Sequence, residues 1–424
     1  MSRPIEPELQ HYLGSFLLQT AMMAAMTLIP FFCFQHLGGG ERSAALAYGV
    51  QTLSLGITCF VSAPFVSHWR NGLLGCFVGA AGFGAFYFLA SFAESVIAFC
   101  VLTGISMCFF ALAWPALQSW LGAQPNEQKR TTSFSRFNIA IGLGLTAGPL
   151  VEGGLDQLNF RAAFLGVLLL SLAAAALLFI LPQEKAYFSS HAVPDSSAPS
   201  HPVSAANCRA SEIFLYCGWV MNMVGWGLTG AVRTVYAGQL ARLVHRGQLV
   251  LLSLSLPVHV FTATGGPAAA TLYSWLQTVL SLGYFGAILL MGRTTRWQHK
   301  IGLIVAAQTA LAAGIWVLAG SQSLLLIFAC HATMGAYTGF AYMSSQCYST
   351  ANPARKHTRI AINEGLSQSS GFILPLAFAQ LGAWYGLSRP FQYAPLLLAG
   401  VIIFELISLR YAKRRINSSI PLEA

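Results

Sequence analysis

The sequence predicts an all-α integral membrane protein with twelve transmembrane helices, arranged as two six-helix bundles. Its composition is the first observation: 55% of the 424 residues are hydrophobic and only 8% are charged, whereas soluble domains carry about 25% charged residues. The second observation is a series of apolar runs, each near the length of about 20 residues that spans a bilayer. The third is a repeat that relates the two halves of the chain.

The apolar runs divide into two sets of six. The first six form an N-terminal bundle within residues 1–182, and the last six form a C-terminal bundle within 211–424. The expected spans are residues 11–35, 43–67, 73–91, 94–121, 136–158, 160–182, 211–238, 267–292, 300–319, 322–348, 359–385 and 391–411.

Two segments fall outside these spans. Residues 183–210 are rich in Ser, Pro and Ala and have no apolar period, a composition typical of a flexible linker. Residues 239–266 contain an apolar run, Leu249 to Phe261, that is too short to cross a bilayer. This second segment is expected outside the membrane, as a surface helix, a lid or an extension of the eighth span.

A repeat supports the two-bundle arrangement. Both copies read Arg, Asn, Gly, Pro and then Arg followed by Phe, in the same direction, as expected of a parallel duplication. The first copy also holds several glycines, which let two membrane helices approach closely. We expect gating or structural roles for six residues of the repeat: Arg136, Asn138, Gly148, Pro149, Arg359 and Asn363.

The basic residues indicate the topology. With the N-terminus inside, 17 of the 23 Lys and Arg residues fall on the inner side and five on the outer, while Arg233 lies near the end of the seventh span. This asymmetry follows the positive-inside rule and predicts an even number of spans with both termini cytoplasmic. The expected location is a bacterial cytoplasmic membrane.

Composition also argues against other classes of protein. No basic run with interleaved aromatic residues suggests nucleic-acid binding. The nine cysteines are scattered and form no CxxC pair, so we expect neither a metal site nor a disulfide framework. No cofactor is expected, and the expected partners are a small-molecule solute and the lipid bilayer, with a monomeric chain.

This organisation resembles the major facilitator superfamily of transporters. Gly144, Gly148 and Pro149, followed by the pair Gly153-Gly154, are similar to the fifth-helix motif of the family's proton-coupled antiporters, although Glu152 occupies the first of the motif's paired glycine positions. The loop after the second span keeps Arg70 but lacks the family's acidic residue. The resemblance implies a central cavity lined by spans 1, 4, 7 and 10, and two halves that rock to open it on each side in turn.

Five polar or aromatic residues on the spans implied to line the cavity are candidate substrate contacts. They are Gln19 in the first span, Asn222 and Trp226 in the seventh, and His331 and Tyr342 in the tenth. Binding pockets combine apolar walls with a few polar groups. Packing between helices is the alternative for each of them, and Arg233 is expected to snorkel at the outer boundary or to clamp a substrate.

Three acids fall inside expected spans, where a charge costs about 2.5–3.5 kcal/mol. Glu152 and Glu364 are the candidate proton-coupling groups; for Glu364 an ion pair with Arg359 is the alternative. Glu405 is expected to pair near Arg410.

The expected function is secondary active transport of a small organic solute by alternating access, with protons as the candidate coupling ion and the solute's own gradient as the alternative driving force. The fifth-helix motif favours export. No phosphate-binding loop suggests ATP as the driver. One alternative is a non-transporting sensor or assembly protein on the same fold. The other is a membrane-embedded lipid-modifying enzyme, which the dispersed His residues disfavour, so no enzymatic activity is expected.

Overall fold

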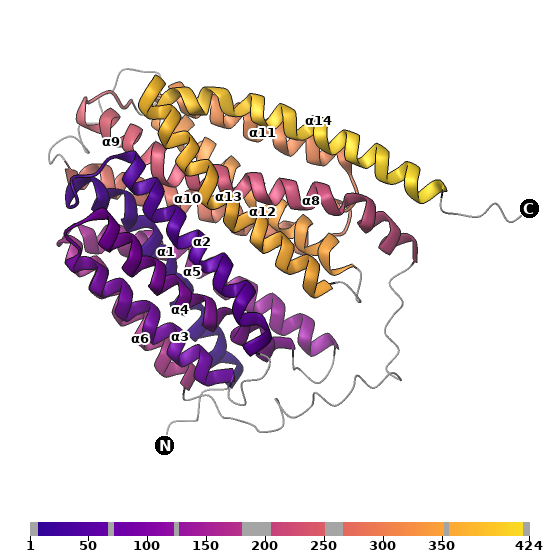
Figure 1. Cartoon of the computed structure of the whole chain (residues 1–424), viewed down its shortest axis with the longest axis horizontal. Coiled ribbons are helices and arrows are strands. Elements are labelled where there is room, and N and C mark those ends of the chain that lie inside the picture. Colours follow the sequence, from indigo (N-terminus) through magenta and orange to yellow (C-terminus); the bar gives the residue numbers. More distant parts are fainter. Residues whose placement is uncertain are drawn as a thin grey trace, which may run out of the picture.

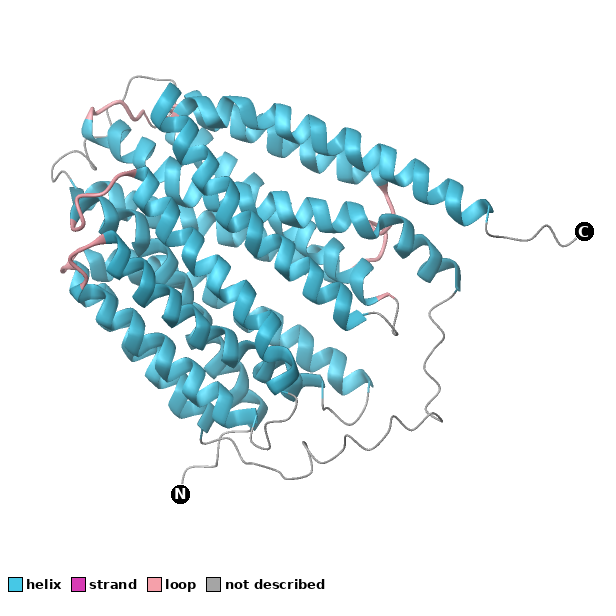
Figure 2. Ribbon diagram, viewed as in Figure 1, coloured by secondary structure: helices cyan, strands magenta, loops and turns pink. Residues whose placement is uncertain are grey.

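The computed structural model describes residues 7–66, 72–122, 127–179, 205–250, 266–351 and 356–418. Within these ranges the long elements are all helices (Figure 2). An isolated backbone bridge joins Val250 to Ser323. Arg70 and residues 180–204, most of the expected linker, lie outside the described ranges.

The N-terminal bundle consists of six long helices. In it, α1 packs against α5 and α6, while α3 packs against α4 and α6, around an apolar core of its own. The helices are α1 (Pro7–Gln35), α2 (Glu41–Val66), α3 (Gly72–Leu89), α4 (Val96–Gly122), α5 (Glu127–Asp156) and α6 (Phe160–Phe179), with a 3-10 turn η1 (Ala90–Phe92) after α3.

The C-terminal bundle also contains six long helical runs, packed around a second apolar core. Its first run is continuous through α8 (Ala205–Ala231), a π-helical segment η2 (Val232–Tyr236) and α9 (Ala237–His245). The other five are α10 (Gly266–Gly292), α11 (Ile301–Gly320), α12 (Leu324–Thr350), α13 (Lys356–Tyr385) and α14 (Ser388–Ser418).

The twelve predicted spans all coincide with helices. Boundaries differ most where polar residues continue a helix beyond the apolar run: α5 begins at Glu127 rather than 136, and α14 continues to Ser418 rather than 411. In the same way, α8 begins at Ala205, so the last six residues of the segment expected as linker are helical.

The segment 239–266 is only partly described. Its start continues the seventh span as α9, and its last residue, Gly266, begins α10. Most of the apolar run from Leu249 to Phe261 lies outside the described residues.

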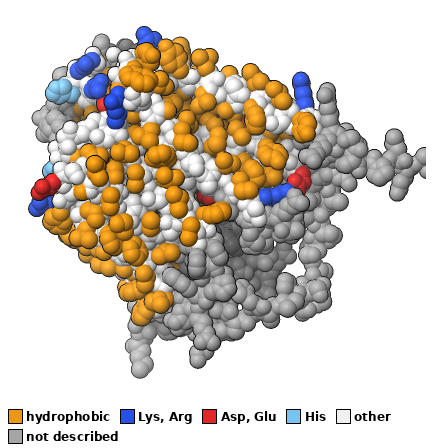
Figure 3. Space-filling view, viewed as in Figure 1, with side chains coloured by type: hydrophobic (Ala, Val, Ile, Leu, Met, Phe, Trp, Pro, Cys, Tyr) orange, Lys and Arg blue, Asp and Glu red, His pale blue; other side chains and the backbone are white. Residues whose placement is uncertain are grey.

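The surface has the composition expected of a protein that spans a membrane several times. Nine helices of the described residues are long and apolar enough to span a membrane. Large apolar side chains lie on the outside of the bundles, among them Phe60, Ile97 and Leu396 at 67%, 74% and 71% exposure. Figure 3 shows apolar side chains across the middle of one face and most charged ones near its margins. Such a surface is stable in lipid and not in water.

The two bundles meet at one end of the molecule and diverge toward the other (Figure 1). The "terminal end" is the end at which α1 and α8 begin and α14 finishes, and the "far end" is the opposite one. The bundles contact each other mainly through α2 against α13 and α5 against α10. The far end is therefore the closed end in this conformation.

The glycines of the first repeat copy pack as predicted. A Cβ at Gly148 would lie 2.6 Å from the carbonyl oxygen of Thr20 and from the Cβ of Met23, and one at Gly144 would lie 2.7 Å from the carbonyl oxygen of Phe16. Helices α1 and α5 thus touch backbone to backbone inside one bundle. In the second copy, Gly371 instead faces Thr52 of α2, across the boundary between the bundles.

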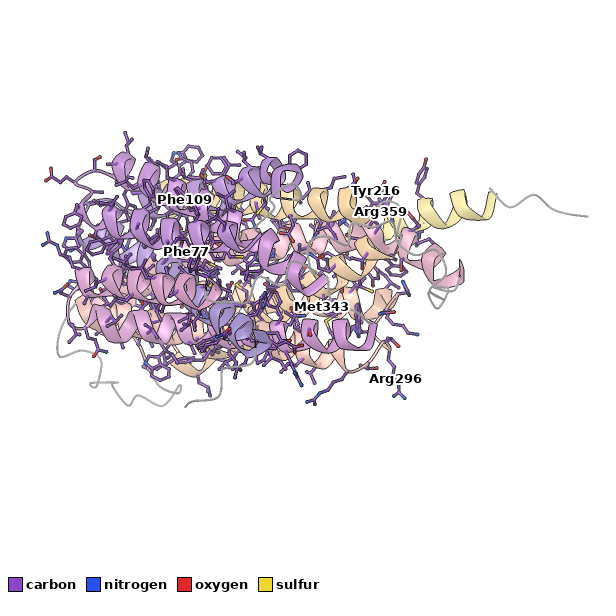
Figure 4. All side chains as sticks on the ribbon, turned by 90° about the horizontal axis from the view of Figure 1, so that it is seen from below. Phe77, Phe109, Tyr216, Arg296, Met343 and Arg359 are labelled. Atoms are coloured by element: carbon purple, nitrogen blue, oxygen red, sulfur yellow. The ribbon has the colours of Figure 1, made fainter. Side chains whose placement is uncertain are left out.

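The repeat is also visible in two ion pairs near the terminal end. Arg136 of α5 lies 3.7 Å from Glu8 of α1, and Arg359 of α13 lies 2.7 Å from Glu212 of α8. Both pairs tie the fifth helix of a bundle to its first helix. They differ in burial, because the Arg136 side chain is 60% exposed and that of Arg359 only 8%; Figure 4 shows Arg359 among the helices near this end.

Candidate functional site

A buried hydrogen bond joins the bundles in the far half of the molecule. Ser274 of α10 donates to the carboxylate of Glu152 on α5 at 2.6 Å, and each of these residues is 2% exposed. Gly153 makes this approach possible, because a Cβ there would lie 2.7 Å from the Cβ of Ser274. Glu152 is therefore part of the contact that holds the two bundles together.

Arg233 of η2 binds α10 about one turn further along, at Gln277. Its Nε donates to the Gln277 side chain at 3.2 Å, and its Nη2 lies 3.9 Å from the sulfur of Met23 on α1. Nη1 is buried and has no hydrogen-bond partner among the described residues. The expectation that Arg233 snorkels to the boundary is wrong: the residue is 5% exposed, because α1 and α10 close over it.

Two further contacts cross between the bundles at the far end. Arg242 of α9 forms a 2.8 Å ion pair with Glu41 at the start of α2. Gln157, just after α5, donates to the Thr271 hydroxyl of α10 at 3.3 Å. Apolar contacts also cross the boundary, since Phe31 of α1 packs against Tyr273 of α10 with ring centroids 5.4 Å apart.

Asn222 is a contact within the C-terminal bundle. Its amide nitrogen donates to Asn363 at 3.2 Å and to Ser367 at 2.7 Å, both on α13. Its oxygen is buried without a partner among the described residues. The structure therefore favours the helix-packing interpretation of Asn222. In the repeat, Asn138 is exposed where Asn363 is buried, so the two do not share an environment.

Aromatic side chains from three helices of the C-terminal bundle lie close together. The rings of Trp226 on α8 and Tyr342 on α12 have centroids 6.4 Å and 6.0 Å from that of Tyr284 on α10. All three are partly exposed, as expected of residues that line a solvent-filled space. The sequence reasoning missed Tyr284 because the resemblance placed its span outside the cavity lining.

Glu364 lies beside this aromatic group. Its carboxylate accepts a hydrogen bond from Gln346 of α12 at 3.1 Å, and it is partly exposed. The expected ion pair with Arg359 is wrong, since Arg359 binds Glu212 instead. The physical reason is the helical period: residues five apart point about 140° away from each other.

His331 and Gln19 are both buried. The His331 Nδ1 is 2.8 Å from the carbonyl oxygen of Ile327 in its own helix, and the ring packs against Tyr236 with centroids 5.5 Å apart. Gln19 packs on Gly144, and its Oε1 has no partner in the described part of the chain. Neither side chain joins the aromatic group or the Glu152 contact through a hydrogen bond.

The third buried acid has a different partner from the one expected. Glu405 of α14 accepts a hydrogen bond from Gln308 of α11 at 2.8 Å. The expected pairing near Arg410 is wrong, because the Arg410 side chain is exposed while Glu405 is fully buried. Glu405 therefore stabilises the packing of two peripheral helices.

Comparison with known families agrees with this architecture. A family model described as Major Facilitator Superfamily matches residues 12–265, more than half of the chain. The chain belongs to the major facilitator superfamily. Comparison with curated protein sequences gave no match. As a member of this family, the chain is a multi-pass membrane protein of the transporter class rather than an enzyme.

Solved transporters have a similar fold. The nucleoside transporter NupG matches with a TM-score of 0.68 at 12% identity, over 96% of this chain and 100% of its own. A POT family transporter in complex with 5-aminolevulinic acid gives 0.73 at 10% identity, over 96% of each chain. A bacterial homologue of the human lysosomal transporter Spinster, in an inward-facing and occupied conformation, gives 0.65 at 12% identity, over 97% of each chain. At these identities the likeness shows the fold alone.

Proposed function

We propose that this chain is a secondary active transporter that moves a small organic solute by alternating access, with Glu152 as a proton-coupling group. The observation that carries the proposal is the buried Glu152–Ser274 hydrogen bond, which crosses between the two bundles. The opening and closing of the far end would make and break this bond, so the state of one titratable group is linked to the conformation of the protein.

The energies of the crossing contacts suit a reversible movement. An exposed ion pair such as Arg242–Glu41 contributes about 0.2–1 kcal/mol, and a neutral hydrogen bond such as Gln157–Thr271 about 0.5–1.5 kcal/mol. With the Glu152 contact, these polar contacts contribute a few kcal/mol in total, and apolar contacts such as Phe31–Tyr273 add to them. A ligand shifts the balance by as much as its affinities for the two conformations differ.

The coupling follows from the cost of burying a charge. A neutral carboxylic acid is cheaper to bury than a carboxylate. In the closed far end Glu152 is 2% exposed, whereas separation of the bundles would let water reach it. Protonation of Glu152 is therefore expected to favour the closed far end, and loss of the proton to favour the open one.

The remaining features of the proposal come from the sequence. The excess of Lys and Arg predicts that the terminal end faces the cytoplasm, with the bacterial inner membrane as the location. The likeness of the α5 segment to the antiporter motif favours export. We propose a monomer, because each bundle has its own core and the two together enclose the site.

The test is solute-driven proton flux in liposomes. The purified protein is reconstituted with a pH-sensitive dye inside, and a library of small organic solutes is added outside. We expect flux with at least one solute, lost in Glu152→Gln. A matched control is Glu405→Gln, which removes a buried acid that bonds Gln308 away from the bundle boundary, and which should keep the flux.

Two outcomes would contradict the proposal. Transport whose pH dependence is unchanged in Glu152→Gln would exclude Glu152 as the coupling group. A complete absence of solute movement, in cells that lack or overproduce the protein as well as in liposomes, would favour the alternative of a non-transporting sensor.

A further inference from the structure

Arg233 is a buried cation without an acidic partner. No carboxylate of the described residues forms an ion pair with it, and its Nη2 contacts the thioether of Met23 instead. A thioether is a weak acceptor, and an uncompensated charge in the membrane interior is expensive. Glu152 of α5 is not its partner, because the side chain of Glu152 accepts a hydrogen bond from Ser274. The guanidinium therefore has unused capacity for an anionic group.

The backbone around Arg233 points to function independently. Residues Val232–Tyr236 form a π-helical segment between α8 and α9, and all five are buried. A π segment widens one helical turn and turns the side chains that follow it, and such segments occur frequently at functional sites. The carbonyl oxygen of Arg233 is also fixed by the Tyr273 hydroxyl at 2.7 Å, so its position is well defined.

An acid without a basic partner lies toward the terminal end. Glu364 accepts one hydrogen bond from Gln346 and pairs with no Lys or Arg of the described residues. Gln346 lies one helical turn from Tyr342 on α12, so Glu364 is next to the aromatic group. Aromatic faces beside a carboxylate are a favourable environment for an organic cation.

The aromatic group lies between the two charges. Gln277, which bonds Arg233, and Tyr284 are seven residues apart on α10, which is two helical turns or about 10 Å along the axis. Because α10 begins at the far end, Arg233 lies on the far side of the aromatic group, and Glu364 lies on its terminal side.

We propose that this site binds an amphoteric solute, whose anionic group pairs with Arg233 and whose cationic group pairs with Glu364. The aliphatic or aromatic middle of the solute would lie against Trp226, Tyr284 and Tyr342. This inference deepens the proposed transport function and depends on it. Because Gln277 beside Arg233 and Tyr284 in the aromatic group are about 10 Å apart along α10, the charges of the solute are several bonds apart.

The binding step exchanges weak contacts for strong ones. A carboxylate arriving at Arg233 displaces the Met23 sulfur, and Met moves aside easily because it has flexible rotamers. The bond that forms is charge-assisted and bidentate geometry is available to a guanidinium. A solute with only one of the two charges satisfies one end of the site and leaves the other charge unpaired, so it binds more weakly.

Three probes of equal chain length test the proposal: 6-aminohexanoate, hexylamine and hexanoate. Their dissociation constants are measured on the purified full-length protein by thermal shift and calorimetry, with 4-aminobutanoate and 8-aminooctanoate to bracket the spacing. We expect 6-aminohexanoate to bind at least tenfold more tightly than either singly charged probe. Arg233→Gln should remove its advantage over hexylamine, and Glu364→Gln its advantage over hexanoate.

Controls separate binding from folding. Glu405→Gln should keep the full preference, and Arg233→Lys should restore part of the preference lost in Arg233→Gln, because Lys keeps the charge but not the bidentate geometry. Equal binding of hexylamine and 6-aminohexanoate, with no effect of Arg233→Gln, would overturn the proposal in favour of a cation site. Equal binding of hexanoate and 6-aminohexanoate would overturn the proposal in favour of an anion site. The proposal would also be overturned if no amphoteric probe bound.

The proposed transport function can fail separately. Transport of a singly charged solute, with proton coupling through Glu152, would refute the amphoteric site and leave the transport function intact. Binding of 6-aminohexanoate without any solute movement in liposomes would leave the amphoteric site intact and refute the transport function.

Discussion

The hydroxyl of Ser274 offers a direct test of whether one buried hydrogen bond sets the conformational balance. Ser274→Ala removes the donor to Glu152 and leaves every ionisable group in place. In the closed far end the carboxylate oxygen would then be buried without that partner, at a cost of about 1–3 kcal/mol. In the open conformation this free-energy cost is small, because water can replace the hydroxyl as the hydrogen-bond donor.

The expected shift is large enough to measure. A change of 1–3 kcal/mol alters the ratio of the two conformations by about 5- to 150-fold. The reporter is a pair of cysteines at Gln157 and Thr271, whose side chains are in contact at 3.3 Å in the closed far end. In a background with the native cysteines replaced, the rate of cross-linking by a short bis-maleimide measures the closed fraction, and Ser274→Ala should lower it.

A neighbouring hydroxyl provides the matched control. Thr278, one turn along α10, is also buried, but its hydroxyl bonds the carbonyl oxygen of Ser274 in its own helix at 2.9 Å. Thr278→Ala should therefore leave the cross-linking rate unchanged. Equal rates in the wild type and Ser274→Ala, or equal losses in the two variants, would refute the idea that the Glu152 contact controls the far end.

Three further outcomes follow from the structure. Arg359→Gln should lower stability by about 1.5–3 kcal/mol because it removes charge-assisted hydrogen bonds to Glu212, whose side chain is 33% exposed, whereas Arg136→Gln at the exposed equivalent pair should cost under about 1 kcal/mol; denaturation of the two variants in mild detergent compares them. Gly148→Ala should cost about 1–3 kcal/mol, since its Cβ would meet Met23 and Thr20, while Gly154→Ala, which meets nothing within 4 Å, should not destabilise; equal melting temperatures would contradict the close contact of α1 and α5. Burial lowers the pKa of His299, in the loop before α11, so this imidazole binds a proton less readily in the folded state than in the unfolded state. The folded state is therefore most stable above the unfolded pKa of about 6.5, and it loses stability as the pH falls below that value. His299→Asn should flatten the melting temperature between pH 7 and 5, and an unchanged slope would show that other groups dominate.

Sequence reasoning predicted the parts of this protein that depend on periodicity and depth. Runs of about 20 apolar residues are a direct consequence of the bilayer thickness, which is why all twelve spans coincide with helices. Glycines at helical spacing likewise predicted a close helix contact, and Gly144 and Gly148 make it with α1. These features require no knowledge of which helix lies beside which.

The partners of polar side chains were predicted less well. Glu364 was expected to pair with Arg359 and Glu405 with Arg410, because both bases are near in sequence, yet the partners are Gln346 and Gln308 on other helices. Arg233 was placed at the boundary from its position along the span, but its long side chain turns inward to Gln277. Tyr284 was missed because the resemblance implied that its span does not line the cavity.

The sequence by itself therefore determined the membrane location, the number of helices and their pairing into two similar halves. The tertiary structure decided which side chains face one another, and so brought Glu152 and Arg233 onto one side of α10 and Glu364 against Gln346 of α12. The physical reason is that hydrophobicity fixes how deep a residue lies in the bilayer, while the rotation of each helix about its axis depends on packing against neighbours that are distant in the chain.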